Sequence, residues 1–203
     1  PFLLRDGIVL RLTFSTSSKV IIAFSSAYIS CTFGCRFEPS TQSMENHITV
    51  KRFYEALMAK DAEGMAKLYH DEARFDDPVF EGLQGEEVRN MWRMLLDRAT
   101  DDFKVEVQEV EEDDRQGVAR WEAWYTYSAT NRKIHNKIKA SFEIKDGLIT
   151  YHNDCFTLWT WLGQAYGIKG LLMGWAPWVR TKLRSGARSA LVKYGAKRIE
   201  AAK

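Results

Sequence analysis

Two neighbouring side chains, His152 and Asp154, combine groups that can move a proton. They are two residues apart in a stretch with strand-like alternation, so both should leave the same face. Histidine changes charge near neutral pH, and a carboxylate on the same face can exchange a proton with it. On a pocket-facing surface the pair could relay a proton to a bound molecule. On a solvent-facing or dimer-facing surface it would be an ordinary hydrogen-bonded pair, and both interpretations stay open.

A second candidate carboxyl group, that of Asp77, lies in a mostly apolar stretch. Its apolar neighbours in the chain are Phe75, Pro78, Val79 and Phe80. A carboxylate held away from water is suited to accept a proton from carbon. The alternative is a turn in which Asp76 and Asp77 accept hydrogen bonds from nearby backbone amides. Both interpretations stay open for Asp77 as well.

Aromatic residues make up 13% of the chain and are dense between residues 92 and 127. A packed core and sheet explain most of them, and those that face a cavity would favour a flat or polycyclic apolar ligand. The residues that we expect to contact such a ligand are Tyr54, Phe75, Trp92, Trp121 and Tyr125.

Metal and disulfide chemistry are not indicated. The three cysteines, Cys31, Cys35 and Cys155, are too few for a disulfide ladder or a four-ligand zinc set. The four histidines are too scattered for a metal site. Cys155 alternates to the face opposite Asp154, where we expect it in the core. We therefore predict no metal, no cofactor and a reducing, cytoplasmic setting.

Helices are predicted before Thr100 and strands after it. Apolar residues recur at i, i+3, i+4 and i+7 over 50–57 and again over 88–95. Between these stretches, Asp61 can cap a helix whose inward side ends at Tyr69. Period-two alternation then follows through residue 158, with a hairpin turn at 145–147. This order predicts an α+β domain: three helices packed on a meandering antiparallel sheet.

Composition divides the chain into three parts. Residues 1–43 are rich in serine and threonine and poor in acids, and we expect a disordered leader or an upstream-translated segment. Residues 44–162 form the predicted domain. Residues 163–203 carry nine Lys or Arg residues against one acid, Glu200, in a basic helical extension that Pro177 can open.

The basic extension admits three interpretations. It could be a solvated helix docked on the domain, with 170–177 as a lid over a pocket. It could lie through 168–203 on an anionic membrane surface, with Leu171, Leu172, Trp175 and Trp178 entering the interface. Nucleic-acid binding is set aside, because the aromatic residues are not arranged as base-stacking positions and the net charge is only +2.

The element order and the segments 50–57 (VKRFYEAL), 73–79 (ARFDDPV) and 145–154 (KDGLITYHND) resemble the nuclear-transport-factor-2-like superfamily. Within it the chain is most similar to SnoaL-like polyketide cyclases and ketosteroid isomerases, over roughly residues 45–160. The resemblance implies a cone-shaped half-barrel, made by a strongly bent antiparallel sheet and helices around an apolar pocket. It also implies a homodimer formed through the sheet.

The resemblance assigns roles residue by residue. The general base of ketosteroid isomerases falls on Asp77, and the acid–base aspartate of the cyclases falls near Asp154. The two oxyanion donors of the isomerases fall on Phe53 and Ala140, which carry no donor. Loss of such donors costs about 2.7–4 kcal/mol each, which argues against steroid isomerisation by that route. The catalytic set we predict is Asp77, His152 and Asp154.

We therefore expect a SnoaL-like protein that binds a small apolar molecule and transfers a proton without a cofactor, as an isomerase or cyclase does. The alternative is a non-catalytic ligand-binding or dimerisation domain, membrane-peripheral through its basic helix. Residue types do not decide between these functions, because the fold hosts both.

Overall fold

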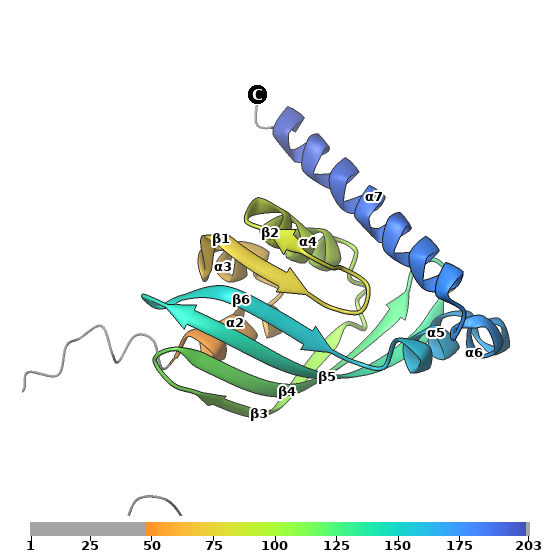
Figure 1. Cartoon of the computed structure of the whole chain (residues 1–203), viewed down its shortest axis with the longest axis horizontal. Coiled ribbons are helices and arrows are strands. Elements are labelled where there is room, and N and C mark those ends of the chain that lie inside the picture. The colour runs from red at the N-terminus through yellow and green to blue at the C-terminus, as the bar shows by residue number, and fades with distance from the viewer. Residues whose placement is uncertain (1–47, 202–203) are drawn as a thin grey trace, which may run out of the picture. The chain divides into compact units, whose positions relative to one another are not determined.

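The structure, a computed structural model, describes residues 48–201, and its first three helices lie in the N-terminal third of that range (Figure 1). They are α2 (Thr49–Met58), α3 (Ala62–Lys67) and α4 (Glu86–Asp97). The predicted apolar stripe is the buried side of α2, where Val50 and Phe53 are inaccessible to solvent. The carboxylate of Asp61 accepts a hydrogen bond from the N–H of Gly64 and caps α3, as predicted. All three helices pack against the sheet or one another.

The sheet has six strands in the order β2-β1-β6-β5-β4-β3. The strands are β1 (Tyr69–Asp76), β2 (Leu83–Gln84), β3 (Lys104–Glu112), β4 (Gln116–Tyr127), β5 (Arg132–Lys145) and β6 (Leu148–Cys155). Neighbours pair antiparallel except β1 and β6, which run parallel. The α+β class is confirmed. The expectation of an antiparallel sheet is wrong, because β6 pairs parallel with β1 after the chain has crossed over through α4 and β3–β5. The bent, cone-like form of the sheet stays a prediction.

Strand β1 was not predicted from the sequence, because the apolar residues at its start are spaced as in a helix. Tyr69, predicted as the last inward residue of a helix, is the first residue of β1. In the parallel pair, Phe75 lies opposite His152 and Asp76 opposite Asn153. Asp77 is the residue after β1, so it lies next to the end of β6, which carries Asp154.

The turn between β5 and β6 follows the prediction. Asp146 and Gly147 are the only residues between the two strands, and both have positive φ, 52° and 76°. Two successive residues with positive φ define the tight hairpin turn whose twist matches that of the strands. The turn pairs Lys145 with Leu148, and an irregularity between Glu143 and Ile144 then shifts the register by one residue, so that Asp154 lies opposite Ala140.

The C-terminal part forms three helices at one end of the sheet and across α4 (Figure 1). They are α5 (Leu158–Tyr166), α6 (Ile168–Met173) and α7 (Pro177–Ala201). Helix α7 begins at Pro177, as predicted, and docks on α4: Arg188 pairs with Glu87 at 2.7 Å, and the Tyr194 hydroxyl bonds to Asp97. Its buried residue Leu191 joins the main core.

The described residues belong to one compact unit. No helix between residues 48 and 201 combines the length and apolar character needed to cross a bilayer. The leader predicted over 1–43 lies outside the described residues.

Candidate active site

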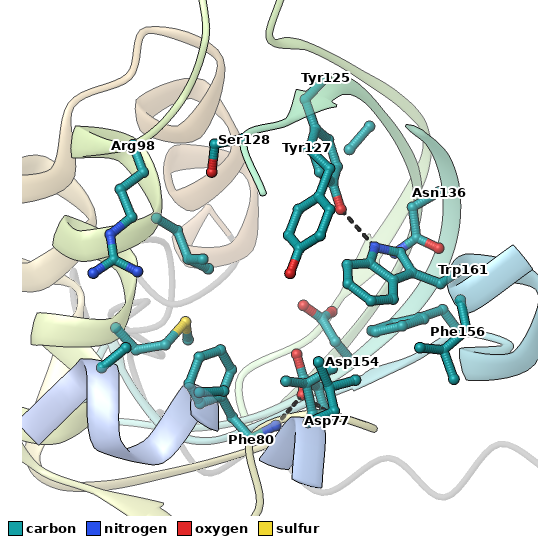
Figure 2. Close-up of a pocket in the computed structure, with 18 of the residues that line it drawn as sticks. Asp77, Phe80, Arg98, Tyr125, Tyr127, Ser128, Asn136, Asp154, Phe156 and Trp161 are labelled. Carbon is teal, nitrogen blue, oxygen red and sulfur yellow. Dashed lines mark hydrogen bonds between the residues drawn. The ribbon is translucent and has the colours of Figure 1, made fainter. Parts of the chain in front are cut away.

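A mostly apolar cavity of about 760 Å³ lies between the sheet, α4 and the C-terminal helices. Its wall includes Phe75 from β1, Trp121 from β4 and Leu183 from α7. The polar side chains that Figure 2 labels on this wall are Asp77, Arg98, Tyr125, Tyr127, Ser128, Asn136 and Asp154. A volume of this size suits a small organic molecule. Helix α7 is therefore a wall of the cavity as well as a helix docked on α4.

Asp77 forms the turn that its sequence allowed, and its side chain also lies at the cavity. Its Oδ1 accepts hydrogen bonds from the backbone N–H of Val79 at 2.6 Å and of Phe80 at 2.5 Å, which is an Asx turn (Figure 2). The same side chain lines the cavity. The turn holds the carboxyl group in place.

Burial raises the pKa of Asp77 from 3.8 to about 7. The two backbone hydrogen bonds lower it, the negative charge of Asp154 raises it further, and Arg184 lowers it. At neutral pH a substantial fraction of Asp77 is therefore protonated and can donate a hydrogen bond into the cavity.

Asp154 also lines the cavity, and two neighbouring side chains lie within hydrogen-bond distance of its carboxyl group. Its Oδ1 lies 3.2 Å from Nε2 of His152 and 3.4 Å from Nε1 of Trp121. On the far side of the imidazole, Nδ1 lies 2.7 Å from the hydroxyl of Tyr69. That hydroxyl accepts a hydrogen bond from Nε1 of Trp92 at 2.8 Å. Four side chains thus form a chain that ends at one carboxyl oxygen.

One assignment of protons satisfies every donor in this chain. Because the Tyr69 oxygen already accepts from Trp92, its own O–H is free to donate to Nδ1 of His152. The imidazole then carries its proton on Nε2 and donates it to Asp154. Every hydrogen bond points toward the carboxyl group, so the chain holds Asp154 in one orientation at the cavity wall.

Tyr125 supplies a further polar group. Its hydroxyl accepts a hydrogen bond from Nε1 of Trp161 at 2.8 Å (Figure 2). The tyrosine proton is therefore free to point at a molecule in the cavity. Burial raises the pKa of Tyr125, outweighing the hydrogen bond from Trp161 that lowers it, so this proton is retained at neutral pH.

The structure brings most of the predicted site residues to one cavity. The predicted residues on its wall are Asp77, Asp154, Phe75, Trp92, Trp121 and Tyr125. His152 lies behind Asp154 with no exposed surface, which excludes the solvent-facing interpretation of the pair. Tyr54 is 1% exposed and is not on the cavity wall, and no described residue bonds to its hydroxyl.

Sequence reasoning missed Tyr69 and Trp161. The only signal for Tyr69 was its place before an alternating segment, and Trp161 lay in a stretch where no function had been predicted.

The expectation for Cys155 is half wrong. Its side chain leaves the strand on the face opposite Asp154, as expected, but Cys155 is exposed there and does not lie in the core. Among residues 48–201, no three His, Cys, Asp or Glu side chains are grouped as ligands for a metal ion.

Comparison with known protein families places the chain. The model of the SnoaL-like domain matches residues 50–152, more than half of the sequence. The chain therefore belongs to the SnoaL-like domain family. The comparison with curated proteins found no match.

Solved structures share the fold at low sequence identity. An epoxide hydrolase of the LEH-like type from M. tuberculosis is 18% identical, with a TM-score of 0.52 over 66% of this chain and 98% of the other. A protein with a ketosteroid isomerase-like fold from Catenulispora acidiphila, solved with trimethylamine, is 15% identical with a TM-score of 0.51, over 64% and 97%. TerC, co-crystallised with polyporic acid, is 14% identical with a TM-score of 0.51, over 62% and 99%. These similarities establish the fold, which hosts several functions.

Proposed function

We propose that the protein binds a small apolar carbonyl compound in the cavity and transfers a proton on it without a cofactor. The observation that carries this proposal is the convergence of Asp77 and Asp154 on one apolar cavity (Figure 2). Two carboxyl groups in different environments are suited to act as acid and base on the same molecule. Two solved structures of the same fold were obtained with small molecules, polyporic acid and trimethylamine, which supports a ligand-binding role.

In the proposed reaction, Asp154 removes a proton from the carbon next to the carbonyl group. The hydrogen bonds from His152 and Trp121 hold its carboxylate in position. The charge that develops on the carbonyl oxygen is stabilised by hydrogen bonds from protonated Asp77 and from the Tyr125 hydroxyl. These two groups replace the donors that are missing at Phe53 and Ala140, and each such donor is worth about 10²–10³ in rate.

Hydrogen–deuterium exchange tests the proton transfer without knowledge of the natural product. The full chain is incubated in heavy water with bicyclic aromatic ketones, and exchange at the carbon next to the carbonyl is followed by NMR. We expect Asp154→Asn to slow the exchange of an accepted ketone by about 10²–10⁴. Asp101→Asn, a change at an exposed aspartate, is the matched control and should exchange like the wild type.

The second candidate is a binding or dimerisation domain without catalysis, favoured by the absence of donors at Phe53 and Ala140. It predicts that ketones quench the fluorescence of the cavity tryptophans while no variant changes their exchange. If Asp77→Asn and Asp154→Asn both exchange as fast as the wild type, the proton-transfer proposal is wrong and this candidate replaces it. An epoxide is included among the probes because one structural relative is an epoxide hydrolase.

A further inference from the structure

Exposed apolar side chains are concentrated where α5, α6 and α7 meet. We call the following residues the α6 patch: Trp159, Tyr166, Ile168, Leu171, Leu172, Met173, Trp175 and Trp178. Ile168, Leu172 and Trp175 are 75%, 67% and 71% exposed. Such a concentration of exposed apolar side chains marks a surface that meets a partner or a membrane.

The patch is held in place by close packing of α6 on α5. A Cβ atom on Gly170 would lie only 1.9 Å from the carbonyl oxygen of Leu162, so the two helices touch through this glycine. With its glycine face turned inward, α6 presents Leu171 and Leu172 to the outside.

Two of the three indole N–H groups in the patch already have hydrogen-bond partners within the protein. Nε1 of Trp159 donates to the carbonyl oxygen of Leu171, and Nε1 of Trp175 donates to that of Leu172, both at 2.8 Å. Because these donors are already satisfied, the rings can enter a layer of hydrocarbon without leaving an unpaired N–H group.

The segment of the chain that carries the patch has charges of one sign. No acidic residue occurs between Asp154 and Glu200 in the sequence. Arg184 and Arg188, further along α7, pair with Glu81 and Glu87. No ion pair within residues 48–201 involves Lys169, Arg180 or Lys182, the basic residues nearest the patch in the chain.

The patch adjoins the cavity. Tyr166, Met173 and Trp178 belong to the patch and also line the cavity wall, as does Lys169. A molecule that leaves or enters the cavity past these side chains therefore crosses the exposed apolar surface.

We propose that the α6 patch docks on an anionic membrane surface and places the cavity opening at the bilayer. The apolar side chains enter the interface, and Lys169, Arg180 and Lys182 face the lipid phosphates. A symmetric dimer through the same patch fits the charges less well, since it would bring the basic residues of two copies together. An anionic lipid surface neutralises them.

Vesicle sedimentation of the full chain tests this proposal. The two vesicle types are phosphatidylcholine alone and phosphatidylcholine with phosphatidylserine. We expect binding to the anionic vesicles that weakens as salt is added, and weaker binding to the neutral ones. Leu172→Glu should reduce the partition coefficient by about tenfold or more, because a large apolar side chain no longer enters the interface.

The matched control is Ile199→Glu, which makes the same change of charge on α7 at a side chain that is 64% exposed, against 67% for Leu172. It should bind nearly as well as the wild type. Equal losses in both variants, equal binding to both vesicle types, or no sedimentation of the wild type would overturn the proposal. So would an analytical ultracentrifugation result in which Leu172→Glu converts a dimer to a monomer while vesicle binding is unchanged.

Discussion

The hydroxyl of Tyr69 lies 2.7 Å from Nδ1 of His152, and the bond joins two strands that run parallel at the centre of the site. Tyr69 opens β1 and His152 lies in β6, 83 positions later. The bond is fully buried, since Tyr69 is 2% exposed and His152 not at all. It links the placement of β1 to the orientation of the imidazole that supports Asp154.

Replacing Tyr69 by phenylalanine should destabilise the protein by about 1–3 kcal/mol. The change leaves Nε1 of Trp92 and Nδ1 of His152 without their partner in a buried environment. Urea unfolding followed by circular dichroism measures the loss. Tyr54→Phe is the matched control, because Tyr54 is equally buried but no described residue bonds to its hydroxyl. It should unfold at the same urea concentration as the wild type or a higher one, and equal losses in the two variants would contradict the chain of hydrogen bonds.

Asp77 should make the stability of the wild type fall as pH rises between about 4 and about 7. Its pKa is near 7 in the folded protein and near 3.8 when unfolded, so the folded state holds an additional proton in that window. Above pH 7 this effect amounts to roughly 4 kcal/mol, from about 1.36 kcal/mol for each pKa unit. In Asp77→Asn the amide oxygen can still accept the two backbone bonds of the turn.

We therefore expect Asp77→Asn to be more stable than the wild type at pH 8, with the difference shrinking toward pH 4. Urea unfolding at a series of pH values measures it, and the exposed Asp101→Asn serves as the control. A difference that stays constant with pH would show that the carboxyl group of Asp77 is not kept from solvent.

Much of the fold was predictable because its elements follow simple periodicities. The stripe over 50–57, the cap at Asp61 and the turn at 146–147 are local patterns, and the structure has all three. Strand β1 was not predictable in this way. Met65, Leu68 and Tyr69 have helical spacing, and a register shift between Tyr69 and Arg74 breaks the alternation that would mark a strand.

The site was predictable only in part. His152 and Asp154 share a face because a strand has period two, and a local pattern was enough to show it. That this face meets Asp77 depends on the parallel pairing of β1 with β6, a contact distant in sequence. The contribution of α7 to the cavity wall could not be predicted from local sequence patterns either. Its docking depends on contacts such as that between Arg188 and Glu87, which are 101 residues apart.

Tyr125→Phe should lower kcat by about 10²-fold on any ketone that the protein exchanges, with a small change in KM. The lost hydroxyl is proposed to strengthen its hydrogen bond as charge develops on the carbonyl oxygen, which affects the transition state more than the bound ketone. The exchange assay in heavy water supplies both constants. Tyr166→Phe, on the same cavity wall but bonded to Tyr127, is the control and should retain kcat. A rise in KM alone would assign Tyr125 to binding.

Gly170→Ala should destabilise the packing of α6 on α5, although alanine favours helices. The new methyl group would lie 1.9 Å from the carbonyl oxygen of Leu162, and because that atom belongs to a helix backbone the two helices must separate. Gly186→Ala in α7 is the matched control: nothing lies within 4 Å of its added Cβ, so it should stabilise the helix by about 0.5–1 kcal/mol. Thermal unfolding of both variants should shift Tm in opposite directions. Faster amide hydrogen exchange in α5 and α6 of Gly170→Ala alone would place its effect at that contact, and an unchanged Tm would show that the helices do not meet there.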